Sequence, residues 1–267
     1  MVNINVECLK GKYSIEQLLE IMRKLRAPDG CPWDKEQTHA SIRSNFLEEA
    51  YEAVDAIDRD HTEDMCEELG DVLMQVVFHA VMAEEENRFD FSDVVDGVCK
   101  KLVYRHPHVF GNVKADTTEK VLDNWEKLKR VEKSQSTYTD TLRSIPSAFP
   151  ALLRAQKVQN RASKAGYDFE SAFAAFLKIK EETDEVNEII NSGNKERLTE
   201  ELGDLLFSVV NTGRLLGIDC EEALSRATAK FTDRFENAEN MIIADGLDMK
   251  EVSSDKLDEY WNKAKTN

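Results

Sequence analysis

A pattern of six acidic residues occurs twice in this chain, and each residue of the second copy lies 133 positions after its counterpart in the first. The first copy is Glu48-Glu49-x-x-Glu52 with Glu67-Glu68-x-x-Asp71, and the second is Glu181-Glu182-x-x-Glu185 with Glu200-Glu201-x-x-Asp204. In both copies the two clusters lie 19 residues apart. A repeat that keeps its register over this distance indicates a tandem duplication, with one acid-bearing unit in each half.

The composition favours helices throughout. Glycine occurs only 11 times and proline 5 times among 267 residues, while Leu, Glu, Lys and Ala, which form helices readily, are common. Apolar residues recur at helical spacing, for example over 46–57 and 69–77. We therefore predict an all-α protein, a tandem repeat of two helical bundles. The expected helices lie near 14–27, 38–59, 62–86, 92–105, 118–133, 150–165, 171–191, 195–216, 219–243 and 248–264.

A segment rich in Ser and Thr lies between the two halves. Residues 134–150 end in Ile145-Pro146 and Phe149-Pro150, and proline clusters of this kind interrupt helices. We predict that this segment is a linker between an N-terminal domain, residues 1–133, and a C-terminal domain, residues 151–267.

Charge and cysteine content narrow the class of protein. The formal net charge of −17 predicts repulsion from nucleic acids and anionic membranes. The five cysteines are odd in number and include no C-x-x-C pair, which favours a reducing, intracellular setting. No apolar run approaches the length of a membrane span, and no signal peptide is visible. We expect a cytoplasmic protein that binds neither membranes nor nucleic acid directly.

The acidic clusters predict a metal centre. Residues i, i+1 and i+4 of a helix lie within about 100° of arc, so each cluster occupies one helix edge. The breaks at 58–61 and 191–194 are short, which predicts antiparallel hairpins that place the clusters opposite each other. Carboxylates alone suit Mg²⁺ or Mn²⁺, and the second half contains no histidine for a zinc site. The alternative, a solvated acidic helix face, explains a single E-E-x-x-E but not the repeated pair.

These motifs resemble those of the MazG family of all-α nucleoside triphosphate pyrophosphohydrolases. The stretches at 30–34, 47–52 and 105–111 are also similar to that family, and the resemblance covers nearly the whole chain. It implies Mg²⁺-dependent hydrolysis of nucleoside triphosphates to the monophosphate and pyrophosphate, with Mn²⁺ as a substitute, and it implies a homodimer. Carried over to this sequence, the metal ligands are Glu182, Glu185, Glu201 and Asp204. Glu182 and Glu201 are then the catalytic residues, acting through a metal-bound water.

We expect a set of substrate-binding residues, and for three of them, Lys230, Arg234 and Trp261, the resemblance implies contact with the nucleotide. The full set is Lys178, Glu181, Arg197, Glu200, Lys230, Arg234 and Trp261. Lysine and arginine neutralise phosphate charge, and tryptophan can stack on a base. For Trp261 the alternative is a structural residue of the core, because tryptophans are mostly buried.

The two halves differ in the charge beside the carboxylates. Lys178, Lys180 and Arg197 of the second half correspond to Asn45, Leu47 and Asp64 of the first. We therefore expect the second half to be the principal catalyst. The first half would serve as a scaffold or dimerisation unit, and its cluster of Glu49, Glu52, Glu68 and Asp71 is left open as a second, weaker site.

The sequence alone leaves two other functions open. One alternative to the enzyme is a regulatory module that binds Mg²⁺-nucleotide and acts through protein partners, and another is a purely structural helical bundle. The sequence does not select a base or a sugar. A broad tolerance for bases, as in control of the nucleotide pool, is the expectation.

Overall fold

The computed structural model describes residues 11–265, which form helices, turns and loops and contain no strand. The chain divides into two compact units, Met1–Leu128 and Lys129–Asn267. The all-α prediction is therefore confirmed. Within residues 11–265, no helix combines the length and the apolar composition needed to cross a membrane.

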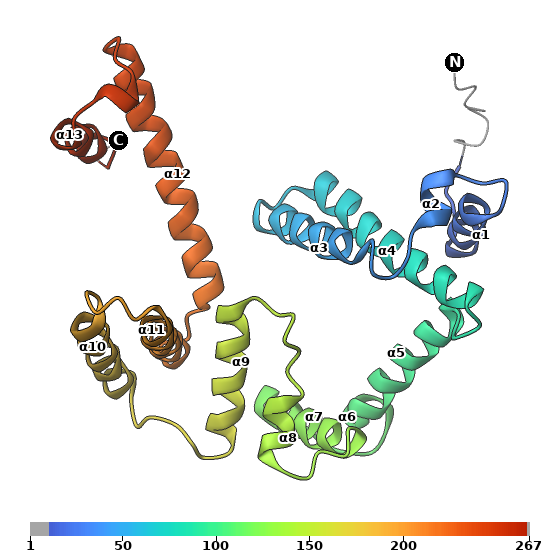
Figure 1. Cartoon of the computed structure of the whole chain (residues 1–267). Coiled ribbons are helices and arrows are strands. Elements are labelled where there is room, and N and C mark those ends of the chain that lie inside the picture. Colours follow the sequence, from blue (N-terminus) through green and yellow to red (C-terminus); the bar gives the residue numbers. More distant parts are fainter. Residues whose placement is uncertain (1–10, 266–267) are drawn as a thin grey trace. The chain divides into compact units, whose positions relative to one another are not determined.

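The first unit is built around a helical hairpin that packs on a shorter helix. Its helices are α1 (Ile15–Arg26), α2 (Pro32–Glu36), α3 (Arg43–Asp58), α4 (Thr62–Glu85), α5 (Phe91–Arg105), α6 (Pro107–Phe110) and α7 (Thr118–Glu132), and α7 continues past residue 128. Helices α3 and α4 form the hairpin, and α1 packs on α4 (Figure 1). Met22 of α1 and Val77, Phe78, Val81 and Met82 of α4 form a buried apolar core.

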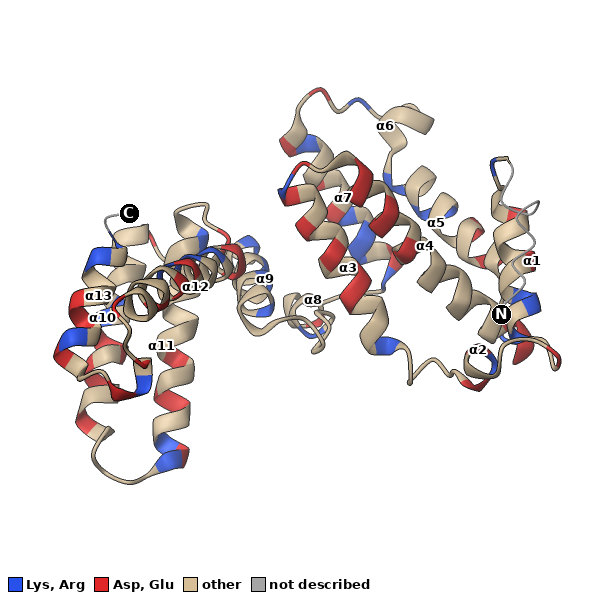
Figure 2. Cartoon of the chain, turned by 90° about the horizontal axis from the view of Figure 1, so that it is seen from above, with Lys and Arg blue, Asp and Glu red and all other residues tan. Residues whose placement is uncertain are grey.

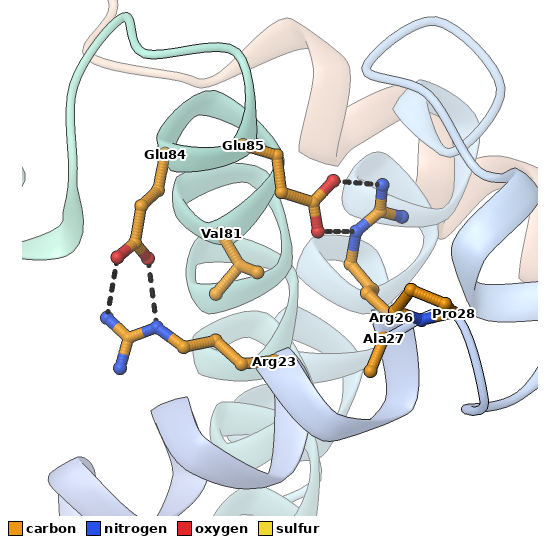
Figure 3. Close-up of a pocket in the computed structure, with 7 residues that line it drawn as sticks. All are labelled: Arg23, Arg26, Ala27, Pro28, Val81, Glu84 and Glu85. Atoms are coloured by element: carbon orange, nitrogen blue, oxygen red, sulfur yellow. Dashed lines mark hydrogen bonds and ion pairs between the residues drawn. The ribbon is translucent and has the colours of Figure 1, made fainter.

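Two arginine–glutamate pairs join α1 to the end of α4. Nε of Arg23 lies 2.9 Å from Oε2 of Glu84, and a terminal nitrogen of Arg26 lies 2.7 Å from Oε2 of Glu85. In Figure 3 the two pairs flank Val81, one on each side. The four side chains border a pocket of about 480 Å³, but each charge is already paired. The pairs thus fix how α1 sits on the apolar core below them.

The second unit repeats the hairpin and adds a long helix. Its helices are α8 (Tyr138–Arg143), α9 (Ala151–Lys164), α10 (Ala172–Ile189), α11 (Lys195–Leu215), α12 (Cys220–Ala244), the short 3-10 helix η2 (Met249–Glu251) and α13 (Ser254–Ala264). Helices α10 and α11 form the hairpin, and α9 packs on α11. Helix α13 packs on α12 through a separate small core that includes Ala238, Ile242 and Tyr260 (Figure 1).

The structure contains the short helices α2, α6 and α8, which the sequence prediction lacks. Three departures from the prediction have a clear local reason. Residues 38–42 form turns rather than the start of α3, because the side chains of Thr38 and Ser41 bond to nearby backbone groups. The predicted linker contains helix α8. A capping box between Thr137 and Asp140, in which each side chain bonds to the backbone nitrogen of the other residue, starts this helix. The helix predicted over 248–264 is broken at Val252, whose backbone is extended.

Candidate metal centre and active site

The second hairpin positions the acidic residues through capped helices and a short turn. Ser171 caps α10 by accepting a hydrogen bond from the backbone nitrogen of Ala174, and Asn194 caps α11 in the same way from Arg197. Five residues separate the two helices. Acidic positions, red in Figure 2, then lie along both arms of the hairpin.

The four predicted metal ligands come together on this hairpin. Oxygen atoms of Glu182, Glu201 and Asp204 all lie within 4.8 Å of one another. Glu182 and Glu201 are buried, with 5% and 9% of their surface exposed, and Asp204 is exposed. The pKa of Glu185 is raised, first by its hydrogen bond with Glu201, then by burial and by the neighbouring charge of Glu182. Clustered carboxylates that are partly withdrawn from water provide the oxygen ligands of a hard divalent cation.

Two basic side chains already contact this cluster. Nζ of Lys178 lies 2.7 Å from Oε1 of Glu181 and 2.8 Å from Oε1 of Glu182. These two hydrogen bonds raise the pKa of Lys178, so the ammonium stays charged. On the facing helix, Nε of Arg197 lies 3.6 Å from Oε1 of Glu201. Lys178 and Arg197 therefore neutralise part of the negative charge of the second hairpin.

The remaining predicted substrate contacts lie elsewhere in the unit. Glu200 is exposed on α11. Lys230 and Arg234 lie on α12 and make no hydrogen bond or ion pair with any residue of 11–265. The ring of Trp261 on α13 lies 5.0 Å from that of Phe231 on α12, centroid to centroid. Because α13 packs on α12, the structure of one chain does not place Trp261 among the carboxylates.

A cavity of about 690 Å³ opens beside the carboxylates, and sequence reasoning missed it. Lys178, Glu182 and Asp204 line one part of it. The rest is lined by residues of α8, α9, α11 and the loop before α10, among them Gln159, Tyr167, Asp168, Phe169, Asn211 and Arg214. The only sequence signal for this cavity was the break at Gly166, which looks like an ordinary helix end. The structure shows that Asp168, just after this break, pairs with Arg214, which lies 46 residues later in the chain.

The first hairpin carries a related acidic cluster, but it lacks the basic residues that lie beside the cluster of the second hairpin. Oxygens of Glu49, Glu68 and Asp71 also lie within 4.8 Å of one another. Burial and the nearby charge of Asp71 raise the pKa of Glu49, which accepts a long hydrogen bond of 3.4 Å from Gln75. Burial, followed by the charge of Glu52, raises the pKa of Glu68. Neutral or acidic residues occupy the positions that Lys178 and Arg197 hold in the second half.

The sequence is similar to known proteins over nearly its whole length. A family model described as the MazG nucleotide pyrophosphohydrolase domain matches residues 37–110 and 163–238, so it covers both hairpins. The nucleoside triphosphate pyrophosphohydrolase of Escherichia coli (strain K12) is 45% identical over 254 residues, which span 94% of this chain and 97% of that protein.

Two further relatives extend this comparison. The nucleoside triphosphate pyrophosphohydrolase/pyrophosphatase MazG of Thermotoga maritima is 44% identical over 94% of this chain and 95% of its own length. The uncharacterized protein YabN of Bacillus subtilis is 43% identical over 92% of this chain, and half of its length is matched. With two domain matches and near-complete alignment to the pyrophosphohydrolases of Escherichia coli and Thermotoga maritima, the chain belongs to the MazG family of nucleotide pyrophosphohydrolases.

Proposed function

We propose that this protein hydrolyses nucleoside triphosphates between the α- and β-phosphates, releasing a nucleoside monophosphate and pyrophosphate, and that the second half performs the reaction. The observation that carries the proposal is the convergence of Glu182, Glu201 and Asp204 beside a cavity large enough for a ligand. Membership of the MazG family and the names of its full-length relatives support the same reaction.

The donor set fits Mg²⁺, with Mn²⁺ as a substitute. Glu182, Glu185, Glu201 and Asp204 would hold the ion through carboxylate oxygens, which match the preference of hard cations. A divalent ion held there supplies neutralisation of phosphate charge and lowers the pKa of a bound water. We assign Glu182 and Glu201 to orienting the attacking water, because they are the most buried carboxylates of the cluster.

The cations of the second half would bind the phosphates. Lys178 and Arg197 lie beside the carboxylates that would hold the metal, so they would neutralise part of the charge of a triphosphate bound there. Glu181 and Glu200 are the acidic neighbours at the rim, and Glu181 holds the ammonium of Lys178. Lys230 and Arg234 are proposed to contact phosphate and Trp261 the nucleoside. These three lie on α12 and α13, so their approach to the carboxylates requires a partner copy or a movement of α12.

A homodimer is part of this proposal. Large apolar side chains of the second hairpin and α12 are exposed in the single chain, including Phe173, Leu206, Leu224 and Phe231. A second copy of the chain is the occupant we propose for this surface, since homodimers commonly bury such faces. Light scattering that finds only monomer at micromolar concentration would contradict it.

We also propose broad base tolerance and a cytoplasmic location, where nucleoside triphosphates are abundant. The four cysteines among residues 11–265 are free, in keeping with a reducing compartment.

Product analysis tests the reaction directly. The purified protein is incubated with each common ribo- and deoxyribonucleoside triphosphate, with and without Mg²⁺, and the products are separated by ion exchange. Release of monophosphate and pyrophosphate in equal amounts is expected. Release of diphosphate and orthophosphate would contradict the assigned bond. Nucleotide binding without any product would favour the regulatory module instead.

A further inference from the structure

Two histidines of the first unit form a hydrogen bond between their rings. Nδ1 of His39 lies 2.7 Å from Nδ1 of His79, although the two residues are 40 positions apart in the chain. The ring planes differ by only 5°, and the ring centroids lie 5.0 Å apart. This centroid separation is the nitrogen–nitrogen distance plus one ring radius at each end. The rings therefore meet edge to edge in a common plane, and the hydrogen bond between them is nearly straight.

This hydrogen bond holds a connecting turn against the long helix of the first unit. Residues 37–42 join α2 to α3 and pass beside α4 (Figure 1). Ile42, at the end of the turn, is buried in the core with Met22 and Val77. Among residues 11–265, no other side-chain hydrogen bond joins the turn to α4. The histidine pair is thus the polar contact that fixes the turn on α4, next to the apolar contact of Ile42.

Burial decides which ring donates the proton. A neutral imidazole has one N–H group and one nitrogen that accepts. Nε2 of His39 is buried and has no hydrogen-bond partner. Buried N–H groups without an acceptor are rare, whereas buried acceptors without a donor are less so. Nε2 of His39 is therefore the bare nitrogen, so Nδ1 of His39 donates and Nδ1 of His79 accepts.

A further proton cannot enter this pair without a cost. One bare nitrogen is Nε2 of His39, where a proton would place an unpaired N–H group and a charge in a buried position. The other is Nδ1 of His79, where a proton would set two N–H groups against each other and break the hydrogen bond. Burial, and then the charge of His39, lower the pKa of His79. The closed arrangement therefore favours the neutral rings.

The surroundings offer little compensation for added charge. On α4, Glu86 lies close enough for His39 to lower its pKa, but a hydrogen bond from Arg88 lowers that pKa more, and the glutamate is already paired with it at 2.9 Å. Helix α3 contributes the ring of Phe46, whose centroid lies 5.9 Å from that of His79. Within residues 11–265, no charged group of α1 or α5 forms a hydrogen bond or ion pair with either ring.

A metal ion between the rings is the alternative. Two imidazole nitrogens that bind one tetrahedral zinc ion at about 2.0–2.1 Å lie more than 3 Å apart. The observed separation of 2.7 Å is too short for this arrangement and matches a hydrogen bond. The groups of three or more potential metal ligands within residues 11–265 also include neither His39 nor His79.

We propose that the His39–His79 pair is a pH-sensitive switch, which keeps the turn at 37–42 on α4 when both rings are neutral and releases it when the pair takes up a proton. Both residues are only partly buried, so a charged ring can turn toward water once the hydrogen bond is broken. Release of the turn also removes the support that His79 gives to Phe46 on α3. Acid should therefore loosen the start of α3 before the rest of the first unit.

The direction of the pH effect follows from the proton balance. An unfolded histidine takes up a proton near its ordinary pKa of 6.5, whereas the pKa of His79 in the folded chain is lower. Below 6.5 the open turn therefore binds more protons than the closed turn. The stabilisation by the pair is complete above this value and is lost as the pH falls below it.

The second unit has no such switch. By the 133-residue offset, His39 and His79 correspond to Ala172 and Thr212, and all five histidines of the chain lie in the first unit. The hydroxyl of Thr212 bonds within its own helix, to the backbone oxygen of Ser208. A response that depends on histidine should therefore be confined to the first unit, and the second unit provides an internal control.

Hydrogen–deuterium exchange of the full chain tests the proposal. Mass spectrometry reports the exchange of residues 38–46, and the protection factor is corrected for the effect of pH on the intrinsic exchange rate. His79→Gln removes the titrating ring and keeps a polar side chain. His61→Gln is the matched control, because it removes an exposed histidine of the same unit that does not contact the pair. Residues 206–215 of α11 are followed in the same samples.

The expected result is a pH dependence that requires the pair. Between about pH 7.5 and about pH 5.5, protection of residues 38–46 should fall about tenfold in wild type and in His61→Gln. Protection of residues 206–215 should change less than about twofold. In His79→Gln, protection of residues 38–46 should lose this pH dependence. A wild type without the loss, or a variant His79→Gln that keeps it, would overturn the proposal.

A measurement on the wild-type chain covers the case in which His79→Gln does not fold. With ¹⁵N-labelled histidine, NMR should find the proton of His39 on Nδ1 and that of His79 on Nε2 at neutral pH. Both rings should become charged over the pH range in which residues 38–46 lose protection. Charging of the rings without this loss would overturn the proposal. Added Zn²⁺ that protects residues 38–46 at neutral pH would also overturn it, in favour of a metal site.

Discussion

The ammonium nitrogen of Lys178 lies 2.8 Å from a carboxylate oxygen of Glu182, a side chain whose carboxylate also belongs to the cluster with Glu201 and Asp204. A divalent ion held by the cluster would thus share the carboxylate of Glu182 with the lysine. Two positive charges on one carboxylate repel each other, so metal binding should displace Lys178 toward the cavity that it also borders.

Replacing Lys178 with methionine should therefore have opposite effects on metal and substrate. Mn²⁺ should bind with equal or higher affinity, because a competing cation is removed. KM for the nucleoside triphosphate should rise about tenfold, because the phosphates lose a charge partner. Isothermal titration with Mn²⁺ and steady-state kinetics measure the two quantities. Lys195→Met, an exposed lysine at the start of α11, is the control. Weaker Mn²⁺ binding in Lys178→Met would show that the lysine supports the metal instead.

The double variant Lys230→Ala with Arg234→Ala should lose catalytic efficiency and keep its stability. Neither side chain forms a hydrogen bond or ion pair with the rest of residues 11–265, so their removal costs the folded single chain little. Loss of two phosphate contacts should lower kcat/KM by at least a hundredfold. Thermal unfolding and kinetics are measured on the same preparation. An unchanged kcat/KM would refute the role of this pair.

Inactivating the two hairpins separately tests the division of labour. Glu182→Gln with Glu201→Gln should abolish most activity, because the second hairpin then loses its two buried metal ligands, which lie beside Lys178 and Arg197. Glu49→Gln with Glu68→Gln should leave most of it. Two equal and independent sites would instead leave each variant with about half the wild-type rate. Rates are compared side by side at saturating Mg²⁺, and an inactive first-half variant would reverse our assignment.

The Asp168–Arg214 pair predicts a distinct response to acid. The hydrogen bond from Arg214 lowers the pKa of Asp168 below its ordinary value of 3.8. A lowered carboxyl pKa contributes stability above the unfolded-state value, and this contribution is lost as the pH falls through the folded-state value. The free energy of unfolding of Asp168→Asn should differ from wild type by a constant amount at roughly pH 5 to 7, and the gap should narrow below 3.8. Urea unfolding over this range checks it, and a gap that widens in acid would contradict it.

Much of the architecture is predictable from the sequence because it depends on local signals. The hairpin expected over 171–191 and 195–216 forms over Ala172–Ile189 and Lys195–Leu215, since the apolar period, the capping residues and the short turn all agree. The facing acids follow from that geometry, and the structure places Glu182, Glu201 and Asp204 together. The roles assigned to these residues stay predictions.

The cavity was beyond prediction because it depends on contacts between distant segments. Nothing in Gly166-Tyr167-Asp168-Phe169 distinguishes a loop that lines a cavity from an ordinary helix end. Its meaning depends on Arg214, which only the packing of α11 against α9 brings to Asp168. The short helix α8 was missed for a different, local reason, since its capping box lies in a segment whose composition suggests a loop.

The hairpin of α10 and α11 also determines which changes in chain length the protein can accept. The turn between Ile189 and Lys195 lies outside the acidic clusters, so residues added there leave both helical faces pointing at each other. One residue inserted between Asn194 and Glu201 within the helix would rotate the preceding segment by about 100° relative to the carboxylates. Natural or engineered insertions should therefore collect in the turn and be excluded from the helical stretches that join it to the acids.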